Sequence, residues 1–301
     1  MSFVRFDIIA KVVELGSFTA AAEALNMTQS AVSHAVANLE SEWGVSLFIR
    51  DRKKGIMLTD IGQTLLPHIR EVLNRVEKIQ QEIALTKNIE TGLIRIGTFA
   101  SASACLLPKL LVSYQKKHPK IEFKFYEGTY EEILEWLDSG IIDVGFVVKG
   151  HADEAFDLLP LIKDEMVVAY HPNHRYEQQP IVDITDLAGE PFIMPTGMYQ
   201  SHVEDIFSEA QMKPAVLFEV HDCTTIARMV GEGLGVTIGP ELFLKTQQLV
   251  HIRQLNVSHH REVALACPSL TQASPAVKEF FRVAETVFAK REGLGEGCIK
   301  N

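Results

Sequence analysis

The chain has 301 residues and a net charge of −10, and 47% of its residues are apolar and 23% charged. These values are ordinary for a folded globular protein and exclude a wholly disordered chain. At ~150 residues per domain, the length predicts two or three folded units. No apolar run approaches the ~20 residues of a membrane-spanning helix. The first residues also lack the pattern of a secretory signal, so we expect a cytoplasmic protein.

The acidic charge is unevenly distributed along the chain. Residues 1–90 carry 10 Lys and Arg against 11 Asp and Glu, so most of the acid excess lies in residues 91–301. Because phosphate binding depends on local charge, the net charge does not exclude a nucleic acid as partner. The four cysteines lie far apart without a C-x-x-C pair, which indicates free thiols in a reducing compartment. We expect no metal and no cofactor.

The beginning of the chain predicts three helices, of which the last two form a helix-turn-helix. Apolar residues recur at three- and four-residue spacing over residues 3–13, and Gly16 ends this helix. Ser17 caps a short second helix, and Thr28 caps a third that runs to about Glu42. The outer face of the third helix carries uncharged polar side chains, as a helix that reads bases in the major groove requires.

A basic hairpin follows the third helix. Two short β-like runs, residues 46–50 and 55–59, flank a turn, and four cations stand within residues 50–54. Such a run by itself is typical of a solvated loop. Directly after a helix-turn-helix, it predicts a wing that follows DNA phosphates.

A long helical pattern then extends from Asp60 to about Lys87. Polar side chains cover most of its faces, which leaves a narrow apolar seam that favours pairing with the same helix of a second subunit over simple core packing. The seam consists of Ile69, Val72, Val76, Ile79 and Ile83.

Residues 16–62 strongly resemble the amino-terminal signature of LysR-type transcriptional regulators. Two departures are visible, since Ser30 stands where the family often has proline and Ile61 where it usually has a small residue. The resemblance implies a tetramer that acts on an imperfect inverted repeat, whereas pairing of the long helix alone implies a dimer. It rests on the ordered segments Gly16–Leu25, Thr28–Ser33, Leu39–Glu40, Gly44–Val45, Leu47–Arg50 and Leu58–Gly62.

The rest of the chain alternates strand and helix patterns. A first set covers residues 93–148, with its first helix expected at about 105–117, and a second set covers residues 166–239. The β-α-β-α-β order of the first set predicts a mostly parallel sheet with helices on both faces. No Pro- or Ser-rich linker separates the sets, so we expect two lobes joined by crossing strands near residues 163–169 and 262–267. The arrangement resembles the effector-binding domain of the same family, itself similar to periplasmic binding proteins.

Polar junctions between strands and helices predict a ligand cleft between the lobes. Ligands in such folds bind beyond the carboxyl ends of the strands, and helix amides with hydroxyl groups favour an anion such as a carboxylate. Simple helix capping is the alternative for each junction. The candidate effector-binding residues are Ser101, Ser103, Thr129, Lys149, Thr196, Gly197, Ser201, His202, Cys223 and Thr224.

Two other functions are open. Cys223 falls at a predicted helix N-terminus, where a thiolate is stabilised, so a redox-responsive regulator is one alternative. A cytosolic enzyme that uses the cleft is a remote one. We expect no catalytic residues, because the chain has no G-x-S-x-G, P-loop or H-E-x-x-H motif.

The sequence therefore predicts an α/β protein with an N-terminal all-α winged helix-turn-helix domain and a two-lobed, periplasmic-binding-protein-like effector domain. The expected boundaries are 1–58 for DNA binding, 59–90 for the dimerisation helix and 91–301 for the effector domain, with lobe I at about 91–162 and 268–301 and lobe II at about 163–267.

The function predicted is a sequence-specific transcriptional regulator of the LysR type, controlled by a small anionic effector. Its expected partners are an operator in double-stranded DNA, the effector, further copies of the chain, and RNA polymerase if it activates. Base contacts are assigned to Gln29, Ser30, Ser33 and His34, and phosphate contacts to Arg50, Arg52, Lys53 and Lys54.

Overall fold

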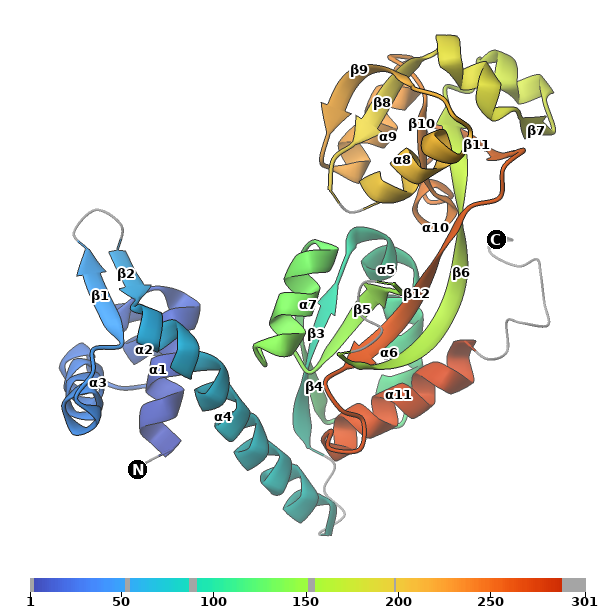
Figure 1. The fold of residues 1–301 in the computed structure, drawn as a ribbon. Helices are drawn as coiled ribbons and strands as arrows, with labels where there is room; N and C mark the ends of the chain where they lie inside the picture. The colour runs from blue at the N-terminus through green and yellow to red at the C-terminus, as the bar shows by residue number, and fades with distance from the viewer. Residues whose placement is uncertain (1–2, 52–54, 87–90, 151–154, 198, 289–301) are drawn as a thin grey trace. The chain divides into compact units, whose positions relative to one another are not determined.

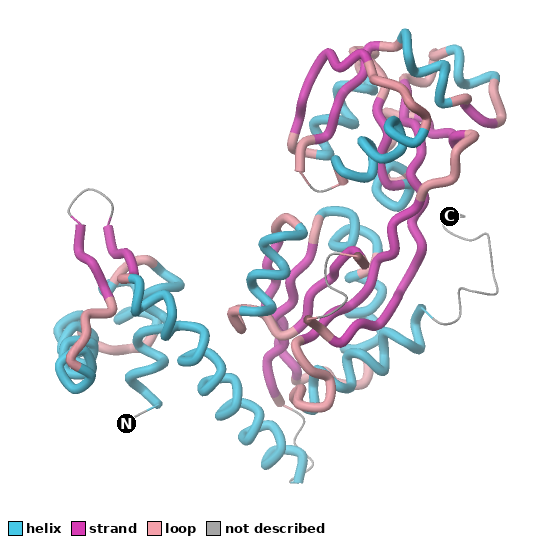
Figure 2. Tube along the Cα trace, in the orientation of Figure 1, coloured by secondary structure: helices cyan, strands magenta, loops and turns pink. Residues whose placement is uncertain are grey.

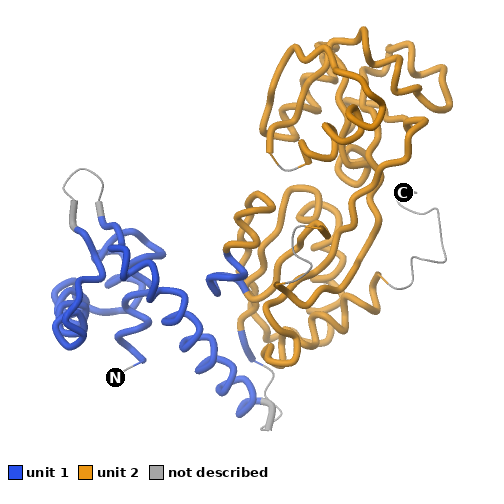
Figure 3. The backbone as a smooth tube through the Cα atoms, in the orientation of Figure 1, with its two compact units in different colours: residues 1–92, 136–142 blue, residues 93–135, 143–301 orange. Residues whose placement is uncertain are grey.

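The computed structural model describes residues 3–51, 55–86, 91–150, 155–197 and 199–288 (Figure 1). The chain divides into two compact units, one of residues 1–92 with 136–142 and one of residues 93–135 with 143–301 (Figure 3). The first unit is mainly helical and the second is mixed α/β (Figure 2). Within the described residues, no helix combines the length and the apolar character needed to cross a bilayer.

The first unit begins with the three predicted helices, α1 (Phe3–Leu15), α2 (Phe18–Ala24) and α3 (Gln29–Trp43). Ser17 accepts the N–H of Ala20 at 3.3 Å, and Thr28 accepts the N–H of Ala31 at 3.2 Å, so both caps act as the sequence predicts. Left-handed backbone at Gly16, Asn26 and Gly44 ends the three helices. The buried faces form one core around Ile9, Val12, Ala21, Val32, Val36 and Leu39.

The predicted hairpin follows, as strands β1 (Phe48–Asp51) and β2 (Gly55–Leu58) in an antiparallel pair. Its base is held from α3, because Glu40 Oε1 accepts the N–H groups of Leu47 at 2.6 Å and Phe48 at 3.2 Å. Thr59 donates its hydroxyl to the carbonyl of Ser46 at 2.7 Å and accepts the N–H of Gly62 at 3.0 Å. The hairpin is therefore fixed between α3 and the following helix, α4 (Asp60–Thr86).

We expect Gly62→Ala to lower the stability of this unit by about 1–3 kcal/mol, as overpacking does. A Cβ at position 62 would lie 2.4 Å from the carbonyl oxygen of Leu47. That oxygen already accepts the N–H of Thr59 at 2.9 Å, so it is not free to move. Thermal unfolding measures the effect. The control is Gly189→Ala, where the added methyl meets nothing within 4 Å, and an equal loss in both variants would contradict the packing argument.

Helix α4 buries only the first part of its apolar seam. Leu66 and Ile69 belong to the core of the unit. Ile79 and Ile83, farther along the same seam, are 57% and 51% exposed. Two large apolar side chains at helical spacing are thus left on the surface of the described chain.

Lobe I of the second unit contains β3 (Gly92–Thr98), α5 (Ala100–Cys105), α6 (Leu107–Gln115), β4 (Ile121–Glu127), α7 (Tyr130–Asp138) and β5 (Val144–Val148). The helix expected at about 105–117 corresponds to α6, whereas the short α5 before it was not predicted. Pro108 lies in the first turn of α6, a position where its missing N–H is tolerated.

Two long strands connect the lobes (Figure 1). Strand β6 (Asp157–Tyr170) pairs with β12 (His260–Cys267) through residues 157–165 and with β10 (Thr237–Pro240) and β11 (His251–Leu255) through residues 166–170. The sheet order is β4-β3-β5-β12-β6-β11-β7, where β7 is Ile181–Val182, with β10 also on β6. Strands β3 and β5 are parallel, as are β8 (Pro191–Pro195) and β9 (Ala215–Val220), but every pair made by β12 or β6 is antiparallel. The sheet is therefore mixed, because the crossing strands run against their neighbours.

In lobe II, two helices, α9 (Cys223–Gly231) and α10 (Glu241–Leu244), pack against β6. Its elements are η1 (Arg175–Gln178), β7 (Ile181–Val182), η2 (Ile184–Gly189), β8 (Pro191–Pro195), α8 (Gln200–Glu209), β9 (Ala215–Val220), α9 (Cys223–Gly231), β10 (Thr237–Pro240), α10 (Glu241–Leu244) and β11 (His251–Leu255). Helix α11 (Pro275–Phe288) follows β12 and packs on α6 of lobe I.

Candidate nucleic-acid interface and effector pocket

The outer face of α3 carries the four residues predicted to contact bases. Gln29, Ser30 and His34 are exposed and Ser33 is half-buried, while Val32 on the opposite face is fully buried. Gln29 Nε2 donates to Ser33 Oγ at 3.4 Å, one helical turn on. The structure thus brings the four residues together on the first half of α3, where the positive end of the helix dipole also lies.

The predicted phosphate-binding cations belong to the hairpin. Arg50 lies in β1 opposite Ile56 of β2. Arg52, Lys53 and Lys54 fall outside the described residues, and so does the side chain of Arg50. Within the described chain, the hairpin is tied to the base of α3 by Glu40.

A small pocket opens between the two lobes of the second unit. Its cavity volume is about 10 Å³, which is room for about one water molecule. Phe99 and α5 and α7 line it from lobe I, and α9 and the residues around β10 line it from lobe II. The lining residues are Phe99, Ala100, Ser101, Tyr130, Tyr199, Cys223, Pro240, Phe243 and Arg261.

Arg261 is the polar centre of this pocket. Its Nε and Nη2 donate to Asp164 Oδ2 at 3.0 and 2.7 Å, its Nη2 also donates to Ser101 Oγ at 2.6 Å, and its Nη1 donates to the Tyr130 hydroxyl. The guanidinium lies 5.3 Å from the ring centre of Phe99. Burial disfavours the charge, but Tyr130 and Asp164 hold the pKa of Arg261 above its ordinary value.

The same ion pair connects the lobes. Asp164 Oδ1 accepts the N–H of Leu242 in α10 at 2.8 Å, so β6 and β12 hold α5 and α7 of one lobe and α10 of the other through two charged side chains. The side chains of Arg261 and Asp164 are 1% and 2% exposed. A ligand that touches Arg261 therefore contacts a group on which the geometry of both lobes depends.

The other titratable groups of the pocket are neutral at physiological pH. Burial raises the pKa of Tyr130, although Arg261 opposes the shift. Burial also raises the pKa of Tyr199 well above its usual value and raises that of the Cys223 thiol. The Tyr199 hydroxyl and the Cys223 thiol also influence each other's pKa. The pocket thus offers phenols and a thiol as uncharged polar groups.

Of the ten predicted effector residues, Ser101 and Cys223 line the pocket. Thr129 and Glu132 form a reciprocal cap at the start of α7, with contacts of 2.8 and 3.2 Å. Lys149 pairs with Glu262 at 3.1 Å, and His202 Nδ1 lies 3.1 Å from His259 Nε2.

The remaining predicted residues lie at helix starts outside the pocket lining. Thr196 donates its N–H to the carbonyl of Val220, and Gly197 donates its own to Gln200 Oε1 at 2.9 Å. Ser201 and Thr224 are exposed, and Ser103 is half-buried within α5. For these positions the structure shows backbone and capping roles or free surface, with no contact to the pocket described above.

Sequence reasoning missed the residues that dominate the pocket. Arg261 and Asp164 lie close to the two strands that were expected to join the lobes. Their opposite charges were the sequence feature that could have predicted an ion pair between these strands. Tyr130 and Tyr199 have no charge and no helix-capping group that would mark them as site residues. The pocket depends on contacts between segments that are far apart in the chain. Arg261 and Asp164, for example, are 97 residues apart.

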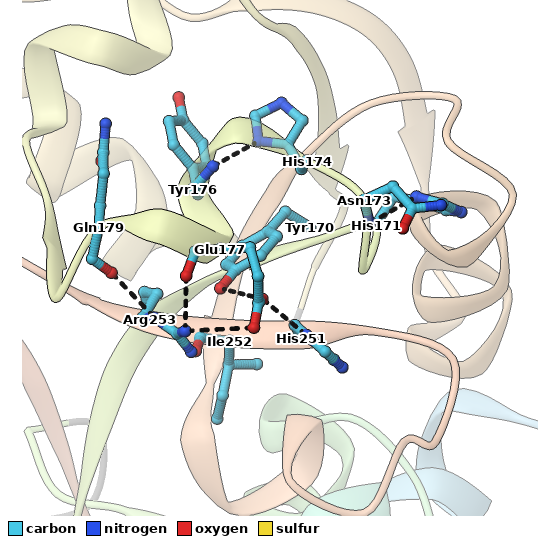
Figure 4. A network of polar contacts seen from close by, with 10 residues as sticks. All are labelled: Tyr170, His171, Asn173, His174, Tyr176, Glu177, Gln179, His251, Ile252 and Arg253. Atoms are coloured by element: carbon cyan, nitrogen blue, oxygen red, sulfur yellow. Dashed lines mark hydrogen bonds and ion pairs between the residues drawn. The ribbon is translucent and has the colours of Figure 1, made fainter.

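A second polar network lies on the surface of lobe II (Figure 4). Glu177 accepts from His251 at 2.7 Å and from the Tyr170 hydroxyl at 3.2 Å, and Arg253 also donates to it. His171 and His174 accept backbone N–H groups in the turn before η1. No group of three or more potential metal ligands occurs in the described chain. This network joins β11 to η1.

The fold and the sites define a DNA-binding protein with a ligand-binding domain. The family model "Bacterial regulatory helix-turn-helix protein, lysR family" matches residues 3–63, and the model "LysR substrate binding domain" matches residues 87–289. The chain belongs to the LysR family of bacterial transcriptional regulators, as its sequence predicts.

Relatives and solved structures agree with this assignment. The uncharacterized HTH-type transcriptional regulator YvbU of Bacillus subtilis (strain 168) is 41% identical over 291 residues, which cover 96% of this chain and 99% of YvbU. Full-length CbnR complexed with its target DNA has the same fold, with a TM-score of 0.69, 20% identity and coverage of 95% and 100%. The effector-binding domain of QuiR in complex with shikimate matches with a TM-score of 0.60, 25% identity and coverage of 67% and 99%.

Proposed function

We propose that this regulator places α3 in the major groove of an operator and uses its hairpin to hold the flanking phosphates. The observation that carries this proposal is the exposed, uncharged polar face formed by Gln29, Ser30, Ser33 and His34. Uncharged amide and hydroxyl groups can read base edges without repelling phosphates. The site of action is then the cytoplasm, and RNA polymerase is a partner if the regulator activates.

Gln29→Ala and Arg50→Ala separate the two roles. Loss of a base contact should cost about 1–3 kcal/mol against the preferred base and change the order of preferred sequences. Loss of a phosphate contact should weaken binding to all sequences alike and reduce the slope of log K against log salt by about 1. The operator is first selected from random duplexes, and affinities are then measured by fluorescence anisotropy at several salt concentrations.

The control for both variants is Gln80→Ala, an exposed side chain of α4 that lies outside the predicted interface. It should leave affinity and preference unchanged. Identical effects of Gln29→Ala and Arg50→Ala would contradict the division between base and phosphate contacts.

The second part of the proposal is control by a small molecule in the pocket around Arg261. Any effector that binds one arrangement of the lobes better than another shifts the population toward it, and DNA affinity follows if the arrangements differ in DNA binding. The link between Arg261, Asp164 and Leu242 supports this role, because it connects the pocket to both lobes.

The third part is self-association through α4. The exposed Ile79 and Ile83 continue a seam that begins in the core of the first unit, and a coiled-coil partner would cover them. Two helix-turn-helix domains related by a two-fold axis match an operator made of an inverted repeat.

A redox-responsive function finds no such support in the pocket. Reactive cysteines are thiolates with a lowered pKa, whereas burial raises the pKa of Cys223. Cys267 shows the same direction, with a pKa raised by burial to about 12. Cys298 lies outside the described residues.

A further inference from the structure

We propose that Glu40 and Thr59 are positioning residues that fix the direction of α4 relative to α3, and that they thereby set the spacing of the two half-sites that a dimer recognises. The inference rests on the proposed binding of DNA by α3 and on the proposed pairing of α4. It goes beyond both, because it assigns specificity to residues that lie outside the two proposed contact surfaces.

The backbone of Leu47 is the point where α3, the hairpin and α4 meet. Its N–H donates to Glu40 Oε1, in the last turn of α3, at 2.6 Å, and the same oxygen accepts the N–H of Phe48 at 3.2 Å. Its carbonyl accepts the N–H of Thr59, the residue before α4, at 2.9 Å. The Leu47 side chain is buried in the core of the unit. One segment is thus bonded to the end of α3 on one side and to the start of α4 on the other.

The Thr59 hydroxyl uses both its donor and its acceptor at this junction. It donates to the carbonyl of Ser46 at 2.7 Å and accepts the N–H of Gly62, in the first turn of α4, at 3.0 Å. The close approach requires glycine, because a Cβ at position 62 would lie 2.4 Å from the Leu47 carbonyl oxygen. Hydrogen bonds depend on angle as well as distance, so these contacts hold the start of α4 in one direction.

Apolar packing in the unit is a weaker constraint on this direction. Helix α3 packs on α1 and α2, and α4 packs on α1 and β2. Burial of apolar surface is non-directional, so these contacts tolerate small rotations of one helix against another. The hydrogen bonds of Glu40 and Thr59 resist such rotations.

Helix α4 converts a small change of angle at the junction into a large displacement. The exposed seam residues Ile79 and Ile83 lie in the last third of this 27-residue helix. At 1.5 Å per residue they are ~30 Å from its start, so a tilt of ~10° moves them by ~5 Å. Successive base pairs are only ~3.4 Å apart. Two helix-turn-helix domains joined at the seam would therefore no longer match the same pair of half-sites.

The test measures the half-site spacing that the full-length chain prefers. The half-site is selected from random duplexes, and inverted pairs of it are built with spacings that differ by one base pair. Affinities are measured by fluorescence anisotropy, and the readout is the ratio of the affinity at the preferred spacing to that at a spacing two base pairs longer. A uniform loss of folded protein or of DNA affinity cancels in this ratio, so a merely structural role would not move it. The unmodified chain should give a ratio of at least ~10, because the gain from linking two sites depends on geometry.

Two substitutions at Thr59 separate the hydroxyl from the shape of the side chain. Thr59→Val removes the hydroxyl and should lower the ratio to below ~3, because a less constrained α4 accepts several spacings. Thr59→Ser retains the hydroxyl and should keep the ratio. The matched control is Thr64→Val in the same helix, where the hydroxyl donates to the carbonyl of Asp60 at 3.0 Å. An unchanged ratio in Thr59→Val, or an equal fall in Thr59→Ser or Thr64→Val, would overturn the proposal.

Glu40 provides a second pair of variants, which decides the question if Thr59→Val does not fold. Glu40→Met removes the acceptor oxygen and should lower the ratio in the same way, whereas Glu40→Gln keeps an acceptor and should retain it. The control is Glu42→Met, since Glu42 pairs with Arg5 at 2.7 Å and takes no part in the junction. A ratio that Glu40→Met leaves unchanged, or that Glu40→Gln lowers equally, would also overturn the proposal.

Sedimentation velocity of the unmodified chain separates this inference from the function on which it rests. A chain that binds no operator would overturn the proposed DNA binding. A monomer on the operator would overturn the self-association through α4 and this inference with it. A dimer that binds the operator but shows no preferred spacing would overturn this inference alone.

Discussion

Asp164→Ala is expected to destabilise the second unit by about 3–5 kcal/mol, the effect of leaving a buried charge without its partner. The Arg261 side chain is 1% exposed, so water cannot replace the lost carboxylate. The N–H of Leu242 loses its acceptor at the same time, which adds to the loss. Urea unfolding followed by circular dichroism measures the shift of the midpoint.

Glu262→Ala is the control for this prediction. Glu262 is next to Arg261 on β12, but it pairs with Lys149 and Lys163 at the surface, where such pairs contribute about 0–1 kcal/mol. Replacement of both buried partners, Asp164→Leu with Arg261→Met, should lose far less than Asp164→Ala, because no unpaired charge remains. Similar losses in all three variants would show that the cost comes from packing and not from charge.

Local signals made the first unit predictable. The caps Ser17 and Thr28 and the left-handed residues Gly16 and Asn26 act within a few positions of themselves, and the structure shows helices α1 to α3 starting and ending at them. The alternating pattern of strands and helices likewise predicted most elements of the second unit, and the crossing strands were placed close to β6 and β12.

The sequence did not predict elements that owe their existence to neighbours. Strand β7 has two residues, and β11 (HIRQL) has two adjacent polar residues that break a strand alternation. Strand β11 is held by pairing with β6, and β7 by pairing with β11. The mostly parallel sheet was predicted for residues 93–148, where β3 and β5 are parallel. That the crossing strand β12 is antiparallel to β5 and β6 could not be predicted, because a residue pattern gives no strand direction. The pocket was the feature hardest to predict, because polar residues between strands and helices, such as Thr129 and Asp222, accept backbone N–H groups of the helices that follow them.

We expect the double substitution Ile79→Asp and Ile83→Asp, which places a carboxylate at each exposed seam position, to lower operator affinity by about 100-fold or more. The two isoleucines are 57% and 51% exposed, so the change adds charge without opening the core of the first unit. Two buried pairs of like charge would separate the α4 helices of a coiled coil. The second helix-turn-helix domain would then bind as an independent molecule. The increase in affinity that comes from linking the domains at two half-sites, about 10²–10⁴-fold, would be lost.

Sedimentation velocity and operator anisotropy on the same preparations check this prediction together. The matched control is the double substitution Gln80→Asp and Glu82→Ala, at two polar residues of α4 outside the seam. It should leave both the oligomeric mass and the operator affinity unchanged. Each half-site alone should still bind the seam variant as it binds the unmodified chain, because α3 and the base of the hairpin are held by Glu40 and Thr59, far from the changed turn of α4. A variant that keeps its oligomeric mass and its operator affinity would refute the role of the seam, and the symmetry of the operator would then need another interface to explain it.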